Sequence, residues 1–256
     1  MTQHRHVRRL GRVAPDLSRL PSVVRAPFVR FTSTAYRLVM DPTKHILVYS
    51  DSLTWGIVPG TRRRLPFDSR WPGVMHNALN VGDVRVRVTE DCLNGRRTVF
   101  DDPYKPGRNA LAGIQQVIEA QSPLDVVVLL LGTNDFQSMH SHDAWHSAAG
   151  LAAVVNAVRT APTEPGMPVP AILLVAPPQL DDPRGPIGPK FAGGDVASRG
   201  LADAIRQVSE DTECAFFDAN SVTTSSTVDG VHLDADQHET LGRALTPVVA
   251  DLLQRA

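Results

Sequence analysis

The stretch VYSDSLTWG, residues 48–56, changes abruptly from apolar to polar residues. The β-branched and aromatic residues before Ser50 are typical of a buried strand, and Ser50-Asp51-Ser52-Leu53 is typical of the loop after one. A serine in such a loop is most often a turn residue. It can also be a nucleophile, because ligands of α/β proteins bind beyond the carboxyl ends of parallel strands. The rest of the chain has to decide between these two interpretations of Ser52.

Beyond residue 44, short apolar runs alternate with longer amphipathic segments. The runs are rich in Val, Ile and Leu without a period of two, which is typical of strands buried on both faces. Strands that alternate with helices predict βαβ units with right-handed crossovers. We therefore predict an α/β fold, a three-layer αβα sandwich around a five-stranded parallel sheet. The predicted strands are 46–50, 84–90, 126–131, 172–176 and 215–218, and the predicted helices are 71–80, 108–120, 144–160, 196–211 and 236–254.

The length and composition exclude several classes of protein. A chain of 256 residues suits one α/β domain with a large core. No apolar run reaches the roughly 20 residues that cross a bilayer, so we expect no membrane span. Cys92 and Cys214 are the only cysteines, which argues against a disulfide framework and favours a reducing, cytoplasmic setting.

The charge of the chain is unevenly distributed. Residues 1–39 contain eight Arg and one acid, a net charge of +7, so the total of −1 leaves −8 for residues 40–256. A basic arm can bind nucleic acid or an anionic membrane, but it can also be a solvated extension. It lacks the uninterrupted apolar stretch of a secretory signal. Because the body is acidic, we expect no nucleic-acid partner. We predict an accessory arm over residues 1–43 and one folded domain over residues 44–256.

Polar residues follow four places where a predicted strand ends. Ser52 follows the first strand, Gly95 the second and Asn134 the third, while Asp229 and His232 lie between the fifth strand and the last helix. Acyl transfer needs such parts: a hydroxyl, an imidazole to take its proton, a carboxylate to orient the imidazole, and donors for the oxyanion. Each part alone has an ordinary explanation, since Gly and Asn favour turns and Asp can cap a helix. All of them together, in this order, favour an acyl-transfer site.

These blocks resemble the SGNH (GDSL-type) hydrolase family over residues 44–254, and the bacterial arylesterase and acyltransferase group most closely. Any one motif is unspecific, whereas the ordered set is highly specific. The motifs are Asp51-Ser52-Leu53-Thr54-Trp55-Gly56, Arg70-Trp71, Leu130-Leu131-Gly132-Thr133-Asn134-Asp135, Ala176-Pro177-Pro178, Phe217-Asp218-Ala219 and Asp229-Gly230-Val231-His232.

The resemblance implies a flavodoxin-like SGNH hydrolase fold and a set of catalytic roles. Ser52 would be the nucleophile, His232 the general base and acid, and Asp229 the residue that orients His232. The oxyanion hole would consist of the backbone N–H groups of Ser52 and Gly95 and the side-chain amide of Asn134.

Further expectations concern the surroundings of the site. The family usually has glycine where this chain has Ser50, and we expect the small serine to be tolerated. By resemblance, the loops 57–70 and 177–194 would narrow the entrance and contribute contacts in a homo-oligomer. The residues expected to line the substrate pocket are Leu53, Trp55, Thr133 and Val231.

Three neighbouring histidines, His140, His142 and His146, lie close to Asp143 in the sequence, a combination that can indicate a metal site. Their spacing does not put three imidazoles on one helical face, and no cysteine cluster accompanies them. We therefore expect no metal, and the proposed chemistry needs no cofactor.

The expected function is that of a serine esterase acting on small-molecule esters. It would hydrolyse short-chain carboxylic or aryl esters through an acyl-enzyme, with acyl transfer to alcohols as a further capability. A carbohydrate O-deacetylase is an alternative with the same site, as is a thioesterase or lysophospholipase. The alternative of a different class is a flavodoxin-like binding module with a vestigial site.

Overall fold

The computed structural model describes residues 43–82 and 84–255. The predicted N-terminal arm lies outside the described residues, except for Thr43. No helix among the described residues is long and apolar enough to span a membrane.

The centre of the fold is a five-stranded sheet in which every neighbouring pair of strands is parallel. The order across the sheet is β2-β1-β3-β4-β5, so the chain moves outward in both directions from β1. β1 and β3 are buried on both faces because helices cover each side. The strands are β1 (Lys44–Ser50), β2 (Val86–Cys92), β3 (Val126–Leu130), β4 (Ala171–Ala176) and β5 (Ala215–Asp218).

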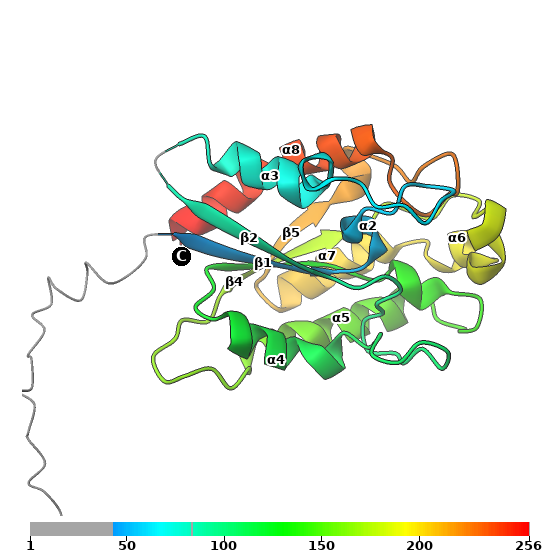
Figure 1. Ribbon diagram of the computed structural model, residues 1–256. Coiled ribbons are helices and arrows are strands. Elements are labelled where there is room, and N and C mark those ends of the chain that lie inside the picture. The colour runs from blue at the N-terminus through cyan, green and yellow to red at the C-terminus, as the bar shows by residue number, and fades with distance from the viewer. Residues whose placement is uncertain (1–42, 83, 256) are drawn as a thin grey trace, which may run out of the picture. The chain divides into compact units, whose positions relative to one another are not determined.

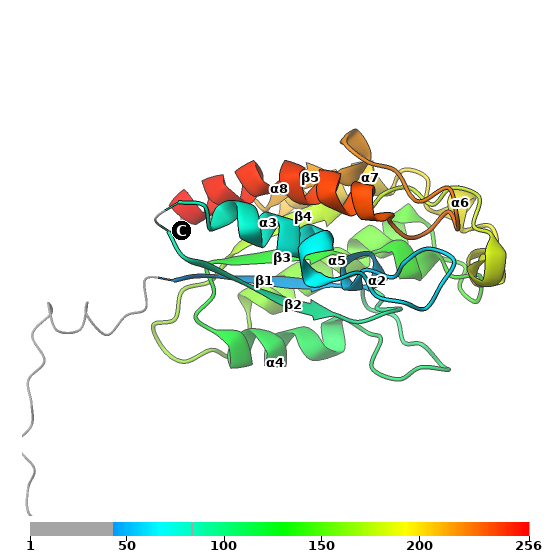
Figure 2. The ribbon, with the colours of Figure 1, turned by 45° about the horizontal axis from the view of Figure 1, so that its top comes forward.

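Helices cover both faces of the sheet. Figures 1 and 2 show α3 and α8 side by side over one face, with α4 and α5 on the other. The α7 helix contacts α5 and shares its core. The helices are α2 (Ser52–Trp55), α3 (Trp71–Leu79), α4 (Leu111–Gln121), α5 (Ala144–Arg159), α6 (Gly194–Ala197), α7 (Leu201–Asp211) and α8 (Ala235–Arg255), with 3-10 turns η2 (Phe67–Ser69), η3 (Thr133–Phe136), η4 (Gly185–Phe191) and η5 (Ala219–Ser221).

The sheet separates two hydrophobic cores. Successive side chains of a strand point to opposite faces. Accordingly, Leu47 and Tyr49 join the core beneath α4, α5 and α7, while Ile46 and Val48 join the core beneath α3 and α8. This arrangement confirms the predicted αβα sandwich with its five parallel strands.

Several predicted boundaries were wrong, and two of them have a clear physical reason. The helix expected over 196–211 is two helices, α6 and α7, because Gly200 adopts a left-handed conformation (φ +82°) that interrupts the helix. The second strand begins at Val86, two residues later than expected. The Asn80 side chain occupies the strand start, accepting from the Val86 N–H and donating to the Val86 carbonyl, each at 2.9 Å.

The carboxyl ends of the strands lie at one edge of the sheet, because the strands are parallel. The α2 helix follows β1 directly, and the η3 turn begins three residues after β3 ends. The loop after β5 leads to α8. The predicted site residues lie in these connections.

Candidate active site

Ser52 is the first residue of α2, directly after the N-cap residue Asp51. Asp51 Oδ1 accepts a hydrogen bond from the Leu53 N–H at 2.9 Å, which satisfies one of the donors at the start of the helix. Gly56 ends the helix after one turn with a left-handed φ of +81°, and its N–H donates to the Ser52 carbonyl. Ser52 is buried except for 7% of its surface.

Ser50, at the place of the usual family glycine, is buried and fully used in hydrogen bonding. Its hydroxyl donates to the Leu130 carbonyl at 2.6 Å and accepts from the Thr54 hydroxyl at 2.7 Å. Thr54 Oγ1 in turn accepts from the Trp71 indole N–H at 3.0 Å. The serine therefore joins β1 to β3 and to α2 instead of disturbing them.

Asp229 and His232 form an ordered pair in the loop before α8. Asp229 Oδ2 lies 2.8 Å from His232 Nδ1, and Oδ1 accepts the backbone N–H groups of Val231 and His232 at 3.0 and 2.9 Å. Both residues are almost fully buried. The spacing of three residues allows one loop to hold the ring and the carboxylate together.

The hydrogen bonds also determine the charge of Asp229. Burial acts to raise the pKa of this carboxyl, but the hydrogen bonds and positive charge of His232 and the N–H of Val231 outweigh it and lower the pKa to about 2. Asp229 is therefore ionised at neutral pH and can stabilise an imidazolium on His232.

Asn134 is held at both ends of its amide. Its Nδ2 donates to Asp51 Oδ2 at 2.8 Å, and its Oδ1 accepts from Gln137 Nε2 at 2.8 Å. An amide nitrogen has two N–H groups, so the second N–H of Asn134 remains for another acceptor. Asp51 thus orients both the nucleophile helix and the amide, and burial raises the pKa of its carboxyl to about 6.

The other two predicted oxyanion donors are backbone N–H groups. Within the described part of the chain, the N–H groups of Ser52 and Gly95 make no hydrogen bond. Gly95 has a φ of +87°, which favours glycine. The loop that carries it is attached to the sheet by Arg96, which donates to the carbonyls of Ser50 and Asp91 at 2.9 and 2.6 Å.

A buried network supports these groups, and residue patterns in the sequence did not predict it. Arg97, fully buried, donates to Gln137 and pairs with Asp102 at 3.0 Å. Asp135 accepts the N–H and hydroxyl of Thr98 and the hydroxyl of Ser147. The one signal in the sequence is the charged pair Arg96-Arg97 directly after a predicted strand. The Gln137 partner of Arg97 lies 40 residues further along the chain.

Ser52 and His232 meet with Gly95 and Asn134 in one small recess, which we call the inner recess, while Asp229 lines the cavity beside it. The inner recess has a volume of about 40 Å³ and opens beside an outer cavity of about 340 Å³. Within the described residues, no hydrogen bond joins the Ser52 hydroxyl to the His232 ring. Such bonds are often long in enzymes without substrate. The inner recess is lined by Ser52, Ile57, Arg62, Asn94, Gly95, Lys105, Asn134, Ile187, Lys190, Phe191 and His232.

The four residues predicted to line the pocket do not lie in the inner recess or the outer cavity. Leu53 and Val231 are buried in the two hydrophobic cores, because their side chains point away from the site. The Arg64 guanidinium lies over the Trp55 ring, with its central carbon 4.7 Å from the ring centroid. Thr133 lines a separate small cavity with Phe136. Ile57, Ile187 and Phe191 are the apolar residues of the recess instead.

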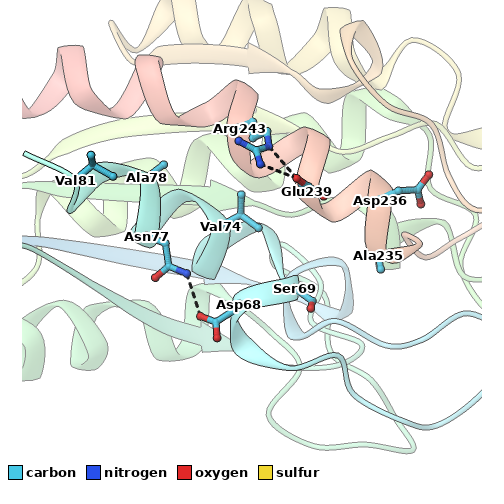
Figure 3. Close-up of a pocket in the computed structure, with 10 residues that line it drawn as sticks. All are labelled: Asp68, Ser69, Val74, Asn77, Ala78, Val81, Ala235, Asp236, Glu239 and Arg243. Carbon is cyan, nitrogen blue, oxygen red and sulfur yellow. Dashed lines mark hydrogen bonds and ion pairs between the residues drawn. The ribbon is translucent and has the colours of Figure 1, made fainter.

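A second, larger cavity lies between α3 and the start of α8 (Figure 3). It has a volume of about 590 Å³, and its lining includes Asn77, Glu239 and Arg243. Glu239 and Arg243 pair with one another, and Asn77 donates to Asp68. It contains none of the predicted catalytic residues, so we do not assign the acyl-transfer site to it.

Two of the three neighbouring histidines, His140 and His142, form a stack of rings with Phe100. His142 lies against Phe100 with centroids 3.7 Å apart and against His140 at 4.8 Å. His146 instead caps α5 together with Asp143. Among the residues that the structure describes, no group of three or more His, Cys, Asp or Glu side chains is arranged to hold a metal ion.

Comparison with known proteins identifies the family. The sequence profile of the GDSL-like lipase/acylhydrolase family matches residues 51–240. An aryl esterase of M. smegmatis is 34% identical, with a TM-score of 0.77 over 82% of this chain and 99% of its own. A carbohydrate acetylesterase family member of Sinorhizobium meliloti is 36% identical, with a TM-score of 0.78 over the same shares. Comparison with curated protein sequences gave no match.

The family profile and the similar solved structures point to the same family as the motifs around Ser52 and His232. The chain therefore belongs to the GDSL-like lipase/acylhydrolase family and is a hydrolase of the SGNH esterase type.

Proposed function

We propose that the protein hydrolyses short-chain carboxylic or aryl esters, with Ser52 as the nucleophile. One observation carries this proposal: Ser52, His232, Gly95 and Asn134, which come from four separate connections, line one inner recess. Asp229 holds the ring of His232 from behind. A binding module with a vestigial site would have no reason to retain this complete arrangement.

The chemistry follows from the roles of these groups. Ser52 Oγ attacks the ester carbonyl carbon while His232 takes its proton, and Asp229 stabilises the resulting imidazolium. The N–H groups of Ser52 and Gly95 and the free amide N–H of Asn134 donate to the oxyanion. His232 then protonates the leaving alcohol as the C–O bond breaks. Water, activated by the same imidazole, releases the acid from the acyl-enzyme.

The size of the inner recess supports a small acyl group. A volume of about 40 Å³ holds little more than one or two water molecules. Ile57 and Phe191 give it apolar walls, which suit an acetyl or similar group. An alcohol that occupies the outer cavity could compete with water for the acyl-enzyme, so we also propose acyl transfer to alcohols.

The test is hydrolysis of p-nitrophenyl esters across acyl lengths by the wild type and by Ser52→Ala. We expect acetate and butyrate to be turned over fastest, and the variant to lose activity on the order of 10⁴-fold or more. Ser69→Ala, the same change at a serine outside the site, is the matched control. Turnover that persists in Ser52→Ala would contradict the proposal. Adding an alcohol and measuring the ester product tests transfer.

Carbohydrate O-deacetylation is the second candidate. The structural relative from Sinorhizobium meliloti is described as a carbohydrate acetylesterase, and the outer cavity contains the polar residues Thr61 and Arg62. Release of acetate from an acetylated sugar at a higher kcat/KM than from p-nitrophenyl acetate would favour this substrate class.

Three expectations from the sequence stay predictions. We propose an accessory role for the N-terminal arm, because the described residues contain the whole sheet and the inner recess. The homo-oligomer rests on resemblance to the arylesterase group and can be tested by light scattering. The cytoplasmic location rests on the cysteine content alone.

A further inference from the structure

We propose that the entrance to the inner recess selects esters that carry a negative charge, through a cationic cluster of Arg62, Lys105 and Lys190. The inference rests on the proposed function, since it names a substrate class for the same site. It concerns a bound anionic substituent such as a carboxylate, sulfate or phosphate, which remains unchanged in the reaction.

The three cations come from different connections and meet at one place. Arg62 lies in the loop after α2, Lys105 in the loop after β2, and Lys190 in η4 after β4. All three line the inner recess, and Arg62 and Lys190 also line the outer cavity. Residues that are 43 and 85 positions apart in the sequence thus place their charges around one opening, where Ser52 and His232 lie.

These cations have no partner of opposite charge in the described part of the chain, and Lys190 lies over the Phe191 ring at 5.9 Å from its centroid. The side chains of Arg62, Lys105 and Lys190 make no hydrogen bond or ion pair there. Other basic residues do: Lys44 pairs with Asp125 at 2.7 Å, and Arg96 pairs with Asp91 at 2.6 Å. Unpaired charges of one sign around a concave site attract ligands of the opposite sign.

No carboxylate in the site neutralises the cluster. Among the described residues that line the inner recess and the outer cavity, Asp229 is the only acid, and its two oxygens are engaged with the His232 ring and with backbone N–H groups. The nearby Asp102 is paired with the buried Arg97 and accepts the N–H of Tyr104. The charge of Asp102 is thereby offset by Arg97, and the cluster keeps its net positive charge.

Lys190 lies next to Gly95, a predicted oxyanion-hole residue. Its Nζ is 3.9 Å from the point where a Cβ on Gly95 would lie, so the ammonium group is next to the predicted oxyanion hole. Partial burial and then the charge of Arg97 lower the pKa of Lys190; the charge of Asp102 opposes this shift, and the charges of Lys105 and Arg62 add to it. A bound anion would offset this mutual repulsion, which is why the site should bind one.

The chemistry of the three side chains fits an oxyanion group. A guanidinium can contact two oxygens of a carboxylate or phosphate at once, while the ammonium groups act as point charges. A neutral substrate would leave all three charges facing only solvent. An ester with a carboxylate on its acyl or alcohol portion would use them.

The experiment compares matched pairs of esters that differ in one charge. The first pair, 4-acetoxybenzoate and 4-acetoxybenzamide, places the charge on the alcohol side. The second pair, mono(4-nitrophenyl) glutarate and its neutral terminal amide, places it on the acyl side. Each kcat/KM is divided by the rate of hydroxide-catalysed hydrolysis, which removes differences in intrinsic reactivity. 4-Acetoxyphenyl phosphate and 4-acetoxyphenyl sulfate then distinguish among the anions.

We expect the charged member of at least one pair to be preferred by about five- to tenfold, as for one or two partly exposed ion pairs. The preference should fall toward one in about 0.5 M salt, because screening weakens exposed charge pairs. Arg62→Gln and Lys190→Gln should each reduce the preference for the charged ester, mainly by raising its KM. Lys190→Arg, which keeps the positive charge, should retain the preference that Lys190→Gln loses. Arg85→Gln is the control: it removes one exposed positive charge at the opposite end of the sheet and should leave the charge preference unchanged.

A ratio near one in both pairs would overturn the inference, as would a preference that neither salt nor the two variants alter. Hydrolysis of 4-nitrophenyl acetate separates this failure from that of the proposed function. If the neutral ester is hydrolysed in a Ser52-dependent way without a charge preference, only the cationic selection is refuted. If no ester is hydrolysed, the esterase proposal itself fails.

Discussion

At the scale of single residues, Asn134 shows how the site is held ready before a substrate binds. Its carbonyl oxygen is occupied by Gln137 and one N–H by Asp51, so the amide cannot rotate without breaking two buried hydrogen bonds. In the proposed mechanism, a donor held in this way needs no reorganisation when the oxyanion forms, and this would be the source of its catalytic value.

We expect Asn134→Ala to lower kcat by about 10²- to 10³-fold with little change in KM, the usual cost of removing one oxyanion donor. Steady-state kinetics on p-nitrophenyl acetate measure both constants. Asn77→Ala removes an exposed amide on α3 and is the control. An equal rise in KM, with kcat retained, would show that the amide binds the ground state instead.

At the scale of elements, α3 begins with an unusual cap. The N-cap residue Arg70 supplies no side-chain hydrogen bond to the first turn. Instead, the Trp71 N–H donates to His238 Nδ1 of α8 at 3.3 Å. The ring can accept this bond only when Nδ1 is unprotonated. Burial, with the charges of Arg70 and His232, accordingly lowers the pKa of His238 to about 3.

This cap predicts a loss of stability in acid. Below pH about 6.5 the unfolded chain protonates His238 while the folded protein does not until pH about 3, so the free energy of unfolding falls by up to about 1.4 kcal/mol per pH unit. His238→Gln keeps an acceptor but does not titrate. We expect the difference in unfolding free energy between wild type and variant to shrink from pH 7 to pH 4.5, measured by urea denaturation.

Two buried carboxyls give the free energy of unfolding an opposite pH dependence, which cancels in the comparison of wild type with His238→Gln. Burial raises the pKa values of Asp51 and Asp135 to about 6, so their contribution to stability is present at low pH and is lost as the pH rises toward 6 and beyond. Both proteins share that trend. Parallel pH dependences in wild type and variant would contradict the assigned role of His238.

The loop of the catalytic pair depends on a close backbone approach at Gly230. It has a φ of +70°, and a Cβ there would lie 2.1 Å from the Asp181 carbonyl oxygen. We expect Gly230→Ala to destabilise the protein by more than about 2 kcal/mol and to lower kcat, because the loop holding Asp229 and His232 must shift. Gly185→Ala, at φ +65° with open space around it, should cost only roughly 1–2 kcal/mol of backbone strain.

Denaturant unfolding and kcat of the two glycine variants separate the effects. If Gly185→Ala were as damaging as Gly230→Ala, the positive φ alone would explain the loss. The contact with the 181–184 loop would then have no special role.

At the scale of the whole molecule, the described residues contain both hydrophobic cores, the complete sheet and the inner recess. We therefore expect a variant without residues 1–42 to fold and to keep its kcat/KM for p-nitrophenyl acetate within about twofold, because the described residues supply every group of the proposed site. Circular dichroism and kinetics test this. A folded but inactive variant would assign part of the site to the arm, and an unfolded one would assign part of the fold to it.

Some parts of the fold and site were predictable because they depend on local sequence. The buried strands around Val48 and Val128 are apolar runs, and Ser52, Asn134 and His232 follow strand ends in chain order. The break at Gly200 was not predictable from periodicity, since a single glycine is tolerated inside many helices. Nor was the strand start at Val86, because it depends on the side chain of Asn80.

The sequence by itself determined the fold class and the candidate residues for acyl transfer, because both are carried by local runs and short motifs. Tertiary structure alone decided what lines the recess. Leu53 and Val231, adjacent to the proposed catalytic residues in the chain, lie in the cores, while Lys190 and Ile187 reach the site from a distant segment. Successive residues leave the backbone in different directions, so proximity in sequence does not determine which side chains face a shared cavity.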